Sequence, residues 1–206
     1  MMTIVPWSDR TVSELATRGW TVLRDFLPRD VVTQLRDEAR EGMAADRFHE
    51  AGVGRGADHE VENAIRGDRI RWIDPSEATP AQQAYWHATE ELQGDLNREL
   101  FLSLVSFEAQ FAIYAPGAFY KTHVDRLEAS DERMISCTLY LNDDWHDEDG
   151  GALRLHVLGG PVDVLPEAGT MVVFRSDSVP HEVLVSSRER YSLTGWFRRR
   201  SLRVVG

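Results

Sequence analysis

Cysteine is nearly absent from this chain, which has one, Cys137, among 206 residues. A single thiol forms no intramolecular disulfide, and it cannot build a structural thiolate zinc site, which takes several cysteines. Any metal site in this chain must therefore use histidine and carboxylate ligands.

Basic residues and long apolar segments are also scarce. Lys and Arg number 23 against 34 Asp and Glu, which gives a net charge of −11. This balance argues against nucleic acid and against anionic membrane surfaces as partners, because both need a basic face. No run approaches the roughly 18 apolar residues of a membrane span, and Pro6, Asp9 and Arg10 interrupt the stretch where a secretory signal would be apolar. We therefore expect a soluble, cytoplasmic protein.

The chain length and the hydrophobic periodicity predict one α+β domain. Two amphipathic helices are expected over 28–45 and from 80 to about 100, with inner faces made of Val31, Leu35, Ala39 and Met43 in the first and Ala84, Ala88, Leu92 and Leu96 in the second. The Gly-rich segment 49–60 between them is expected to be a loop. Short strands separated by turn signals follow at 105–114, 119–125, 134–141, 152–156, 170–175, 181–185 and 190–199. The single domain 1–206 thus divides into a helical part (1–104) and a β-barrel (105–200).

Three side chains suggest a metal site. His123 and Asp125 stand two positions apart at the end of a predicted strand, where both would project from the same face. Such a pair alone is common, and a solvated histidine beside a turn-forming aspartate is the simpler interpretation. His181 opens another predicted strand and supplies a second imidazole. Two histidines and one carboxylate form the facial triad of non-haem Fe(II) oxygenases. The same ligand types also bind Zn²⁺ in hydrolases, so the triad by itself leaves both metals open.

Arg190 favours the oxygenase. In a strand over 190–199 it shares one face with Ser192, Thr194 and Trp196, opposite three residues suited to the core. An unpaired buried guanidinium is costly, so an anionic partner is expected, and the planar fork suits a carboxylate. An ion pair within the protein is the alternative. Together with the triad, the preferred interpretation is an anchor for the distal carboxylate of 2-oxoglutarate, supported by Tyr140 on the polar face of the 134–141 strand.

Several segments resemble one family. These are RGWTVLRDFLP near the start, IRGDRIRWI at 65–73, YAPGAFYKTHVD at 114–125, RMISCTLYLNDDW at 133–145, GGALRL at 150–155, and VPHEV followed by RYSLTGW. Over about 18–197 the chain resembles the 2-oxoglutarate- and Fe(II)-dependent prolyl hydroxylases, in the branch of the hypoxia-inducible-factor prolyl hydroxylases and their bacterial relatives. This resemblance implies a double-stranded β-helix, a jelly-roll or cupin-like barrel, buttressed by amino-terminal helices.

The resemblance also implies roles for individual residues. It implies that Fe(II) is bound by His123, Asp125 and His181, and that the 2-oxoglutarate carboxylate is bound by Arg190 and Tyr140. It places Tyr114, Leu153 and Thr194 in the pocket lining and Trp196 near the substrate. Arg66 and Asp68 fall in a segment that closes over a protein substrate in this family. At Tyr114 the sequence reads Tyr-Ala-Pro-Gly, one residue more than the family pattern.

The function implied is hydroxylation of a prolyl residue in a protein, with O2 as the second cosubstrate, release of succinate and CO2, and ascorbate as a candidate reductant. In the bacterial relatives the target type is elongation factor Tu. A hydroxylase of free amino acids or other small molecules is the first alternative, against which the long segments 49–60 and 65–73 argue. A non-catalytic cupin-like binding or iron-sensing module is the second, but neither a ligand nor the arginine is missing. The oligomeric state stays open, and a monomer is compatible with the sequence.

Overall fold

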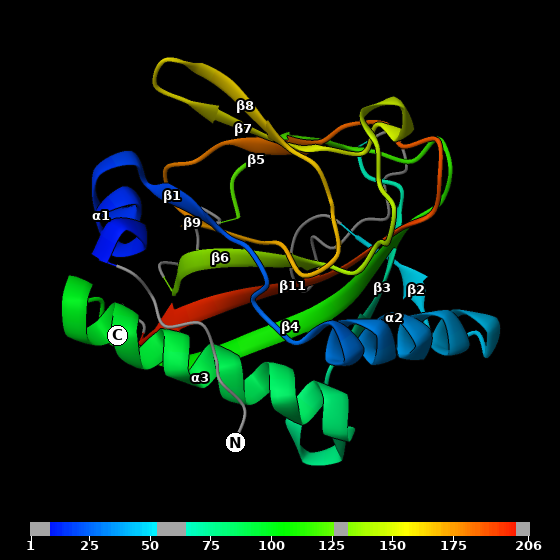
Figure 1. Ribbon diagram of the computed structural model, residues 1–206, viewed down its shortest axis with the longest axis horizontal. Coiled ribbons are helices and arrows are strands. Elements are labelled where there is room, and N and C mark those ends of the chain that lie inside the picture. The colour runs from blue at the N-terminus through cyan, green and yellow to red at the C-terminus, as the bar shows by residue number, and fades with distance from the viewer. Residues whose placement is uncertain (1–8, 53–64, 126–131, 201–206) are drawn as a thin grey trace, which may run out of the picture.

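Two antiparallel sheets form the body of the protein in a computed structural model that describes residues 9–52, 65–125 and 132–200. The larger sheet has the order β1-β9-β6-β11-β4-β3-β2, and the smaller has the order β5-β10-β7-β8. The strands are β1 (Trp20–Leu23), β2 (His49–Glu50), β3 (Asp68–Trp72), β4 (Leu104–Tyr114), β5 (Tyr120–His123), β6 (Arg133–Tyr140), β7 (Leu153–Val157), β8 (Gly160–Val164), β9 (Met171–Arg175), β10 (His181–Val183) and β11 (Arg190–Arg199). The two sheets lie one above the other (Figure 1), which confirms the double-stranded β-helix.

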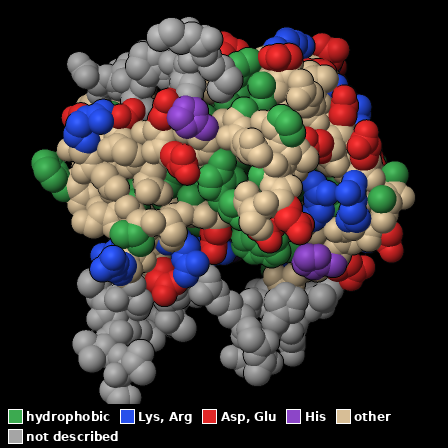
Figure 2. Space-filling view, turned by 90° about the horizontal axis from the view of Figure 1, so that it is seen from below, with side chains coloured by type: hydrophobic (Ala, Val, Ile, Leu, Met, Phe, Trp, Pro, Cys, Tyr) green, Lys and Arg blue, Asp and Glu red, His purple; other side chains and the backbone are tan. Residues whose placement is uncertain are grey.

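Helices cover the outer face of the larger sheet (Figure 1). Those under the sheet are α2 (Arg29–Ala44) and α3 (Pro80–Leu100), while α1 (Asp9–Arg18) lies beside β1. Short 3-10 helices are present at Pro75–Glu77 and Asp147–Asp149. None of the helices in the described part of the chain is both long and apolar enough to cross a bilayer. Seen from below, acidic and basic side chains are interspersed on this side of the molecule rather than gathered by sign (Figure 2).

The inner faces of α2 and α3 differ from the prediction in detail. Leu35 and Ala39 of α2 are buried as expected, but Val31 and Met43 are only half-buried. In α3, Ala84 is likewise half-buried. A strict step of four drifts away from the true period of about 3.6 residues per turn. The buried faces therefore alternate steps of three and four and include Val32 and Gly42 in α2 and Tyr85 in α3.

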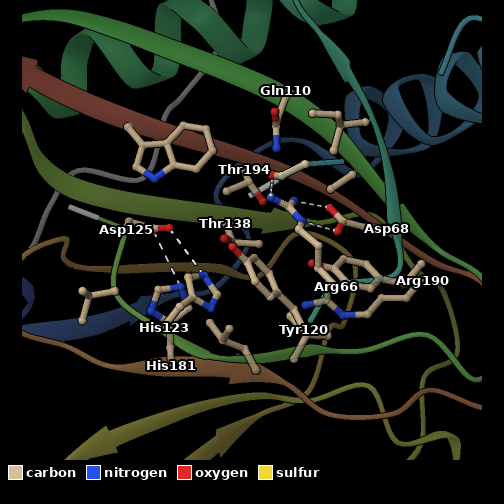
Figure 3. A pocket seen from close by; sticks show the side chains of 18 of the residues that line it. Arg66, Asp68, Gln110, Tyr120, His123, Asp125, Thr138, His181, Arg190 and Thr194 are labelled. Carbon is tan, nitrogen blue, oxygen red and sulfur yellow. Dashed lines mark hydrogen bonds and ion pairs between the residues drawn. The ribbon is translucent and has the colours of Figure 1, made fainter. Parts of the chain in front are cut away.

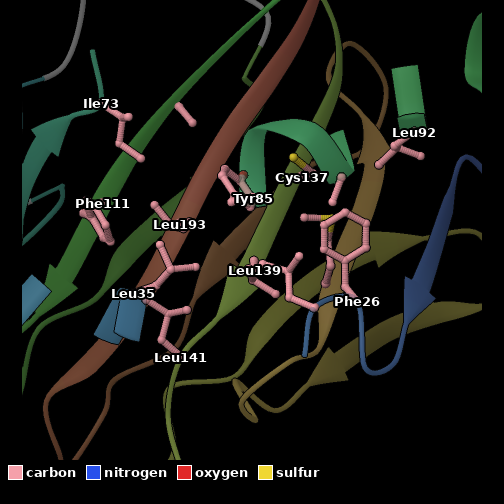
Figure 4. Close-up of a cluster of buried hydrophobic side chains, with 14 of the residues drawn as sticks. Phe26, Leu35, Ile73, Tyr85, Leu92, Phe111, Cys137, Leu139, Leu141 and Leu193 are labelled. Carbon is pink, nitrogen blue, oxygen red and sulfur yellow. The ribbon is translucent and has the colours of Figure 1, made fainter. Parts of the chain in front are cut away.

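The main hydrophobic core lies between these helices and the larger sheet. Alternate residues of β6 and β11 point into it, as the sequence predicted: Ile135, Cys137, Leu139, Tyr191, Leu193 and Phe197. They pack against helical side chains such as Leu35, Tyr85 and Leu92 (Figure 4). Because side chains alternate along a strand, the intervening residues of β6 and β11 face the smaller sheet.

Strand register aligns those intervening residues in rows. β11 pairs with β4 on one side and with β6 on the other. Thr194 therefore stands between Gln110 and Thr138, and Trp196 stands opposite Ser136. Directly opposed residues on one face of a sheet lie close enough to contact each other. The larger sheet thus presents a row of polar residues toward the smaller one, beside an apolar cluster that includes Ala112, Val172 and Phe174.

The amino-terminal part contributes strands as well as helices. β1 pairs with β9, and β3 pairs with β4, so both complete the larger sheet. β1 and β3 are short and lie near the sheet edges, where the alternation of apolar and polar residues is weak. The sequence pattern therefore did not reveal them. Helix α1 and β8 were also missed. In the predicted loop, His49 and Glu50 form β2, while residues 53–60 lie outside the described residues.

Two glycines test how tightly β11 is packed. A Cβ on Gly195 would overlap the Phe107 ring and approach the Glu108 carbonyl oxygen to 3.0 Å, whereas a Cβ on Gly94 of α3 meets nothing within 4 Å. We expect Gly195→Ala to lower the free energy of unfolding by about 1–3 kcal/mol through overpacking. Gly94→Ala should raise it by about 0.5–1 kcal/mol through helix propensity. Urea denaturation followed by circular dichroism measures both, and shifts of the same sign would contradict this packing.

Candidate metal and cosubstrate site

A cavity of about 420 Å³ lies between the two sheets. Ten of the eleven residues predicted for the site line it: His123, Asp125, His181, Arg190, Tyr114, Leu153, Thr194, Arg66, Asp68 and Trp196. The eleventh, Tyr140, is fully buried beside Arg190. The fold thus gathers side chains from β3, β4, β5, β7, β10 and β11 around one space (Figure 3).

Antiparallel pairing of β5 with β10 assembles the three candidate metal ligands. His181, the first residue of β10, stands opposite His123, the last residue of β5. Asp125 lies two residues beyond His123, past the end of β5 rather than within the strand that the sequence predicted. His123 Nε2 is 3.6 Å from Asp125 Oδ1, and His181 Nε2 is 3.7 Å from Asp125 Oδ2. One ligand atom from each residue lies within 4.8 Å of the others, which suits a single metal ion.

Backbone carbonyls orient both imidazoles. His123 Nδ1 is 2.8 Å from the Lys121 carbonyl oxygen, and His181 Nδ1 is 3.1 Å from the Val179 carbonyl oxygen. Because a carbonyl oxygen only accepts hydrogen bonds, each Nδ1 carries the hydrogen. In the neutral imidazole, Nε2 then carries the lone pair on the side facing Asp125, which is the arrangement of a histidine metal ligand.

The protonation states also suit a metal. Burial opposes ionisation of Asp125, but the two neighbouring imidazoles and a hydrogen bond from Ser136 outweigh it and hold the pKa of this carboxyl well below its usual range. Burial lowers the pKa of His181, against the opposing effect of Asp125, so the imidazole favours its neutral form. An ionised carboxylate and a neutral imidazole are the forms that coordinate a cation. The donor set therefore fits Fe(II).

Arg190 is buried with part of its guanidinium unpaired. Its side chain is 1% exposed, its Nε donates to the Gly151 carbonyl oxygen at 2.8 Å, and the rings of Tyr114 and Tyr140 each lie 5.1 Å from its central carbon. Its Nη2 has no hydrogen-bond partner among the described residues. No carboxylate in the described part of the chain forms an ion pair with it, which disfavours the internal ion pair considered above.

Tyr140 presents a second unsatisfied group beside this arginine. Its hydroxyl is buried and has no partner in the described structure. Burial raises the pKa of Tyr140 to about 12, even though Arg190 acts to lower it, so the hydroxyl stays protonated and can donate. Buried donors without partners are rare and destabilising. Two of them together indicate a bound acceptor, and a carboxylate such as that of 2-oxoglutarate fits both the hydrogen bonds and the charge.

Arg66 and Asp68 form a pair at the cavity wall. Arg66 donates from Nε and Nη2 to the two carboxylate oxygens of Asp68, at 2.8 and 2.6 Å. The guanidinium also lies 4.4 Å from the ring centroid of Tyr120, and that ring stacks on His123 at 3.6 Å. The segment leading into β3 therefore reaches the metal ligands through one aromatic side chain.

Several wall residues were not predicted. Trp196 contacts Arg133, whose guanidinium lies 3.7 Å from the indole centroid, and Trp72, whose ring is 5.9 Å away. Gln110 also lines the cavity, and a glutamine within the apolar run of β4 was an available signal for it. Thr138, another lining residue, belongs to the polar face of the 134–141 strand that the sequence placed toward the pocket. Trp72 and Arg133 depend on non-local packing that no local pattern reveals.

A cobalt titration tests the ligand set. We expect the protein to bind one Co²⁺ and His181→Ala to weaken this binding by more than about 100-fold, which exceeds the loss typical of a supporting hydrogen bond. The control is His156→Ala, since His156 is an exposed imidazole paired with Glu182. Isothermal titration calorimetry gives each affinity. Equal losses in the two variants would rule out this assignment.

Comparisons with known proteins agree with this geometry. The family model of the 2OG-Fe(II) oxygenase superfamily matches residues 109–198, which hold the triad and Arg190. The structure of a Pseudomonas putida prolyl-4-hydroxylase is 48% identical, covers 92% of this chain and 98% of its own, and superposes with a TM-score of 0.85. A prolyl hydroxylase from Trichoplax adhaerens, solved with a peptide fragment of the hypoxia-inducible factor oxygen degradation domain, is 26% identical, with coverage of 91% and 87% and a TM-score of 0.81.

Curated relatives extend the match. Egl nine homolog 1 of Rattus norvegicus is 31% identical over 191 residues, which cover 87% of this chain and 55% of the relative. The chain therefore spans about half the length of that curated relative. Because the Pseudomonas putida enzyme is matched over nearly its whole length, the chain belongs to the prolyl hydroxylases of the 2OG-Fe(II) oxygenase superfamily.

Proposed function

We propose that this protein is a 2-oxoglutarate-dependent dioxygenase that uses Fe(II) to hydroxylate a prolyl residue of a protein substrate. One observation carries the proposal: the cavity that holds two histidines and an aspartate also holds a buried arginine with an unpaired nitrogen. A zinc hydrolase would account for the three ligands, but it does not require a buried arginine beside them. An oxygenase that binds an anionic cosubstrate beside its metal needs both.

His123, Asp125 and His181 hold the metal in this proposal. Each histidine offers Nε2, because its Nδ1–H is committed to a backbone carbonyl, and Asp125 supplies negative charge that offsets part of the charge on the cation. Three ligands on one side leave the remaining coordination positions open. When bound, Fe(II) supplies activation of O2, coupled to decarboxylation of 2-oxoglutarate to succinate and CO2, for insertion of oxygen into a C–H bond.

Arg190 and Tyr140 bind the distal carboxylate of 2-oxoglutarate in this proposal. The Gly151 carbonyl and the two tyrosine rings hold the guanidinium in one orientation before any ligand arrives, so little conformational entropy is lost on binding. Exclusion of water strengthens the charge-assisted hydrogen bonds. Leu153 and Thr194 complete the wall, and ascorbate is the candidate reductant that keeps the metal in its ferrous state.

The rim of the cavity supports a protein substrate. Trp72 is 46% exposed and Val124 is 39% exposed, and both line the cavity, so they offer apolar contacts to a chain lying across its mouth. Arg66, which is paired with Asp68, lies over the Tyr120 ring, and that ring stacks on the ligand His123. The peptide bound to the Trichoplax adhaerens relative supports the same class of substrate. Elongation factor Tu is the specific candidate substrate. The proposal includes a cytoplasmic location and a single catalytic domain.

The cosubstrate assignment predicts the effect of removing Arg190. Arg190→Ala should raise the dissociation constant for 2-oxoglutarate by about 30-fold or more, which corresponds to the roughly 2–5 kcal/mol lost when a buried charge pair is truncated. Affinity for Mn²⁺ should stay unchanged, because Arg190 does not belong to the ligand set. The matched control is Arg154→Ala, because Arg154 pairs with Asp163 on the smaller sheet. Calorimetry with the Mn²⁺-loaded protein measures both constants. An unchanged 2-oxoglutarate affinity in Arg190→Ala would refute the anchor.

The reaction itself is tested by mass spectrometry. The Fe(II)-loaded protein is incubated with 2-oxoglutarate, O2 and either bacterial elongation factor Tu, a cytosolic proteome or free proline. We expect one added oxygen on a prolyl residue of a protein together with succinate release, and neither product with Asp125→Ala. Oxygen added only to free proline would refute the protein substrate. Absence of succinate with every substrate would refute the dioxygenase.

A further inference from the structure

The carboxylate of Asp125 is held on one side by a buried hydroxyl. Ser136 Oγ donates to Asp125 Oδ2 at 2.6 Å. Ser136 belongs to β6 of the larger sheet, whereas Asp125 follows β5 of the smaller one, so this hydrogen bond spans the two sheets beside the metal site. The two candidate histidine ligands are each fixed through Nδ1. Each histidine thus has Nδ1 hydrogen-bonded to the protein and Nε2 available, while Asp125 has Oδ2 hydrogen-bonded and Oδ1 available.

A second serine extends this hydrogen bond into a chain. Ser176 Oγ lies 2.8 Å from Ser136 Oγ, and both side chains are fully buried. Because the single hydroxyl proton of Ser136 goes to Asp125, Ser176 must donate to Ser136. The Ser176 backbone N–H also donates to the Met134 carbonyl oxygen at 3.1 Å, which ties Ser176 to β6. The chain of donors therefore runs from Ser176 through Ser136 to Asp125.

The two carboxylate oxygens consequently have different roles. Oδ2 accepts the Ser136 hydroxyl and lies 3.7 Å from His181 Nε2. Oδ1 lies 3.6 Å from His123 Nε2 and accepts no side-chain hydroxyl among the described residues. We propose that Ser136, set in place by Ser176, is a positioning residue that keeps Asp125 a ligand through Oδ1 alone. Coordination through both oxygens would occupy a position that the cosubstrates need. This inference rests on the proposed function, which places a metal at Asp125, but it concerns how the chain itself orients that ligand.

The affinity for Co²⁺ tests the role of Ser136 without turnover. Ser136→Ala removes the hydrogen bond that orients the carboxylate, and we expect its dissociation constant for Co²⁺ to rise about 10–100-fold, as for other groups that support metal ligands. The visible absorption of bound Co²⁺ should change as well, because it reports coordination number. Ser136→Thr retains the hydroxyl and should restore both the affinity and the spectrum. Ser176→Ala keeps the hydrogen bond to Asp125 but removes the hydroxyl that donates to Ser136, and should cause a smaller loss.

Thr21→Val is the matched control. Thr21 is also fully buried, and its hydroxyl donates to the Glu14 carboxylate at 2.9 Å, but neither residue lines the cavity. This variant should lose stability in thermal denaturation while keeping wild-type affinity for Co²⁺. A purely structural role for Ser136 would make the two variants behave alike.

The outcomes separate the two proposals. If folded Ser136→Ala binds Co²⁺ with wild-type affinity and spectrum, or if Thr21→Val loses as much affinity, the positioning role is overturned while the metal site stands. If Ser136→Ala does not fold, Ser176→Ala becomes the deciding variant. Wild-type Co²⁺ affinity and spectrum in Ser176→Ala would then overturn the positioning role. If the wild-type protein binds no Co²⁺, the proposed function fails and this inference fails with it.

Discussion

Alternation of side chains along β11 is the constraint on which the site depends. Leu193 and Phe197 on one face of this strand hold the larger sheet to the helices, and their burial fixes which way the other face points. Arg190, Thr194 and Trp196 must then face the smaller sheet. A register slip of one residue would turn the arginine into the hydrophobic core. The same packing that stabilises the fold therefore places the cosubstrate anchor.

A charge imbalance inside the cavity follows from that placement. The protein is acidic overall, yet Arg190 has no counter-ion within the described structure. Arg66 and Asp68 neutralise each other, and Asp125 faces two imidazoles. Once a metal occupies the triad, the interior carries uncompensated positive charge at the metal and at the arginine. A dianion with a carboxylate at each end suits this distribution, since each end can meet one centre of positive charge.

The sequence predicted the parts of the site that depend on residue type and local periodicity. Alternation in 134–141 and 190–199 separated core from cavity residues correctly, and the histidines, Asp125 and Arg190 were identifiable as functional groups. The contact between Ser136 and Ser176, which are 40 positions apart, was beyond reach, because it depends on pairing of β6 with β9. The pairing of Arg66 with Asp68 was also missed, since local spacing does not distinguish a ligand-binding pair from one that satisfies itself.

A crystal structure of the Mn²⁺-loaded protein with 2-oxoglutarate tests the central claim most directly. We predict the metal at His123 Nε2, Asp125 Oδ1 and His181 Nε2, with the distal carboxylate about 2.7–2.9 Å from Arg190 Nη2 and within hydrogen-bond distance of the Tyr140 hydroxyl. A carboxylate bound elsewhere, or an acidic side chain of the protein itself on Arg190, would contradict the account.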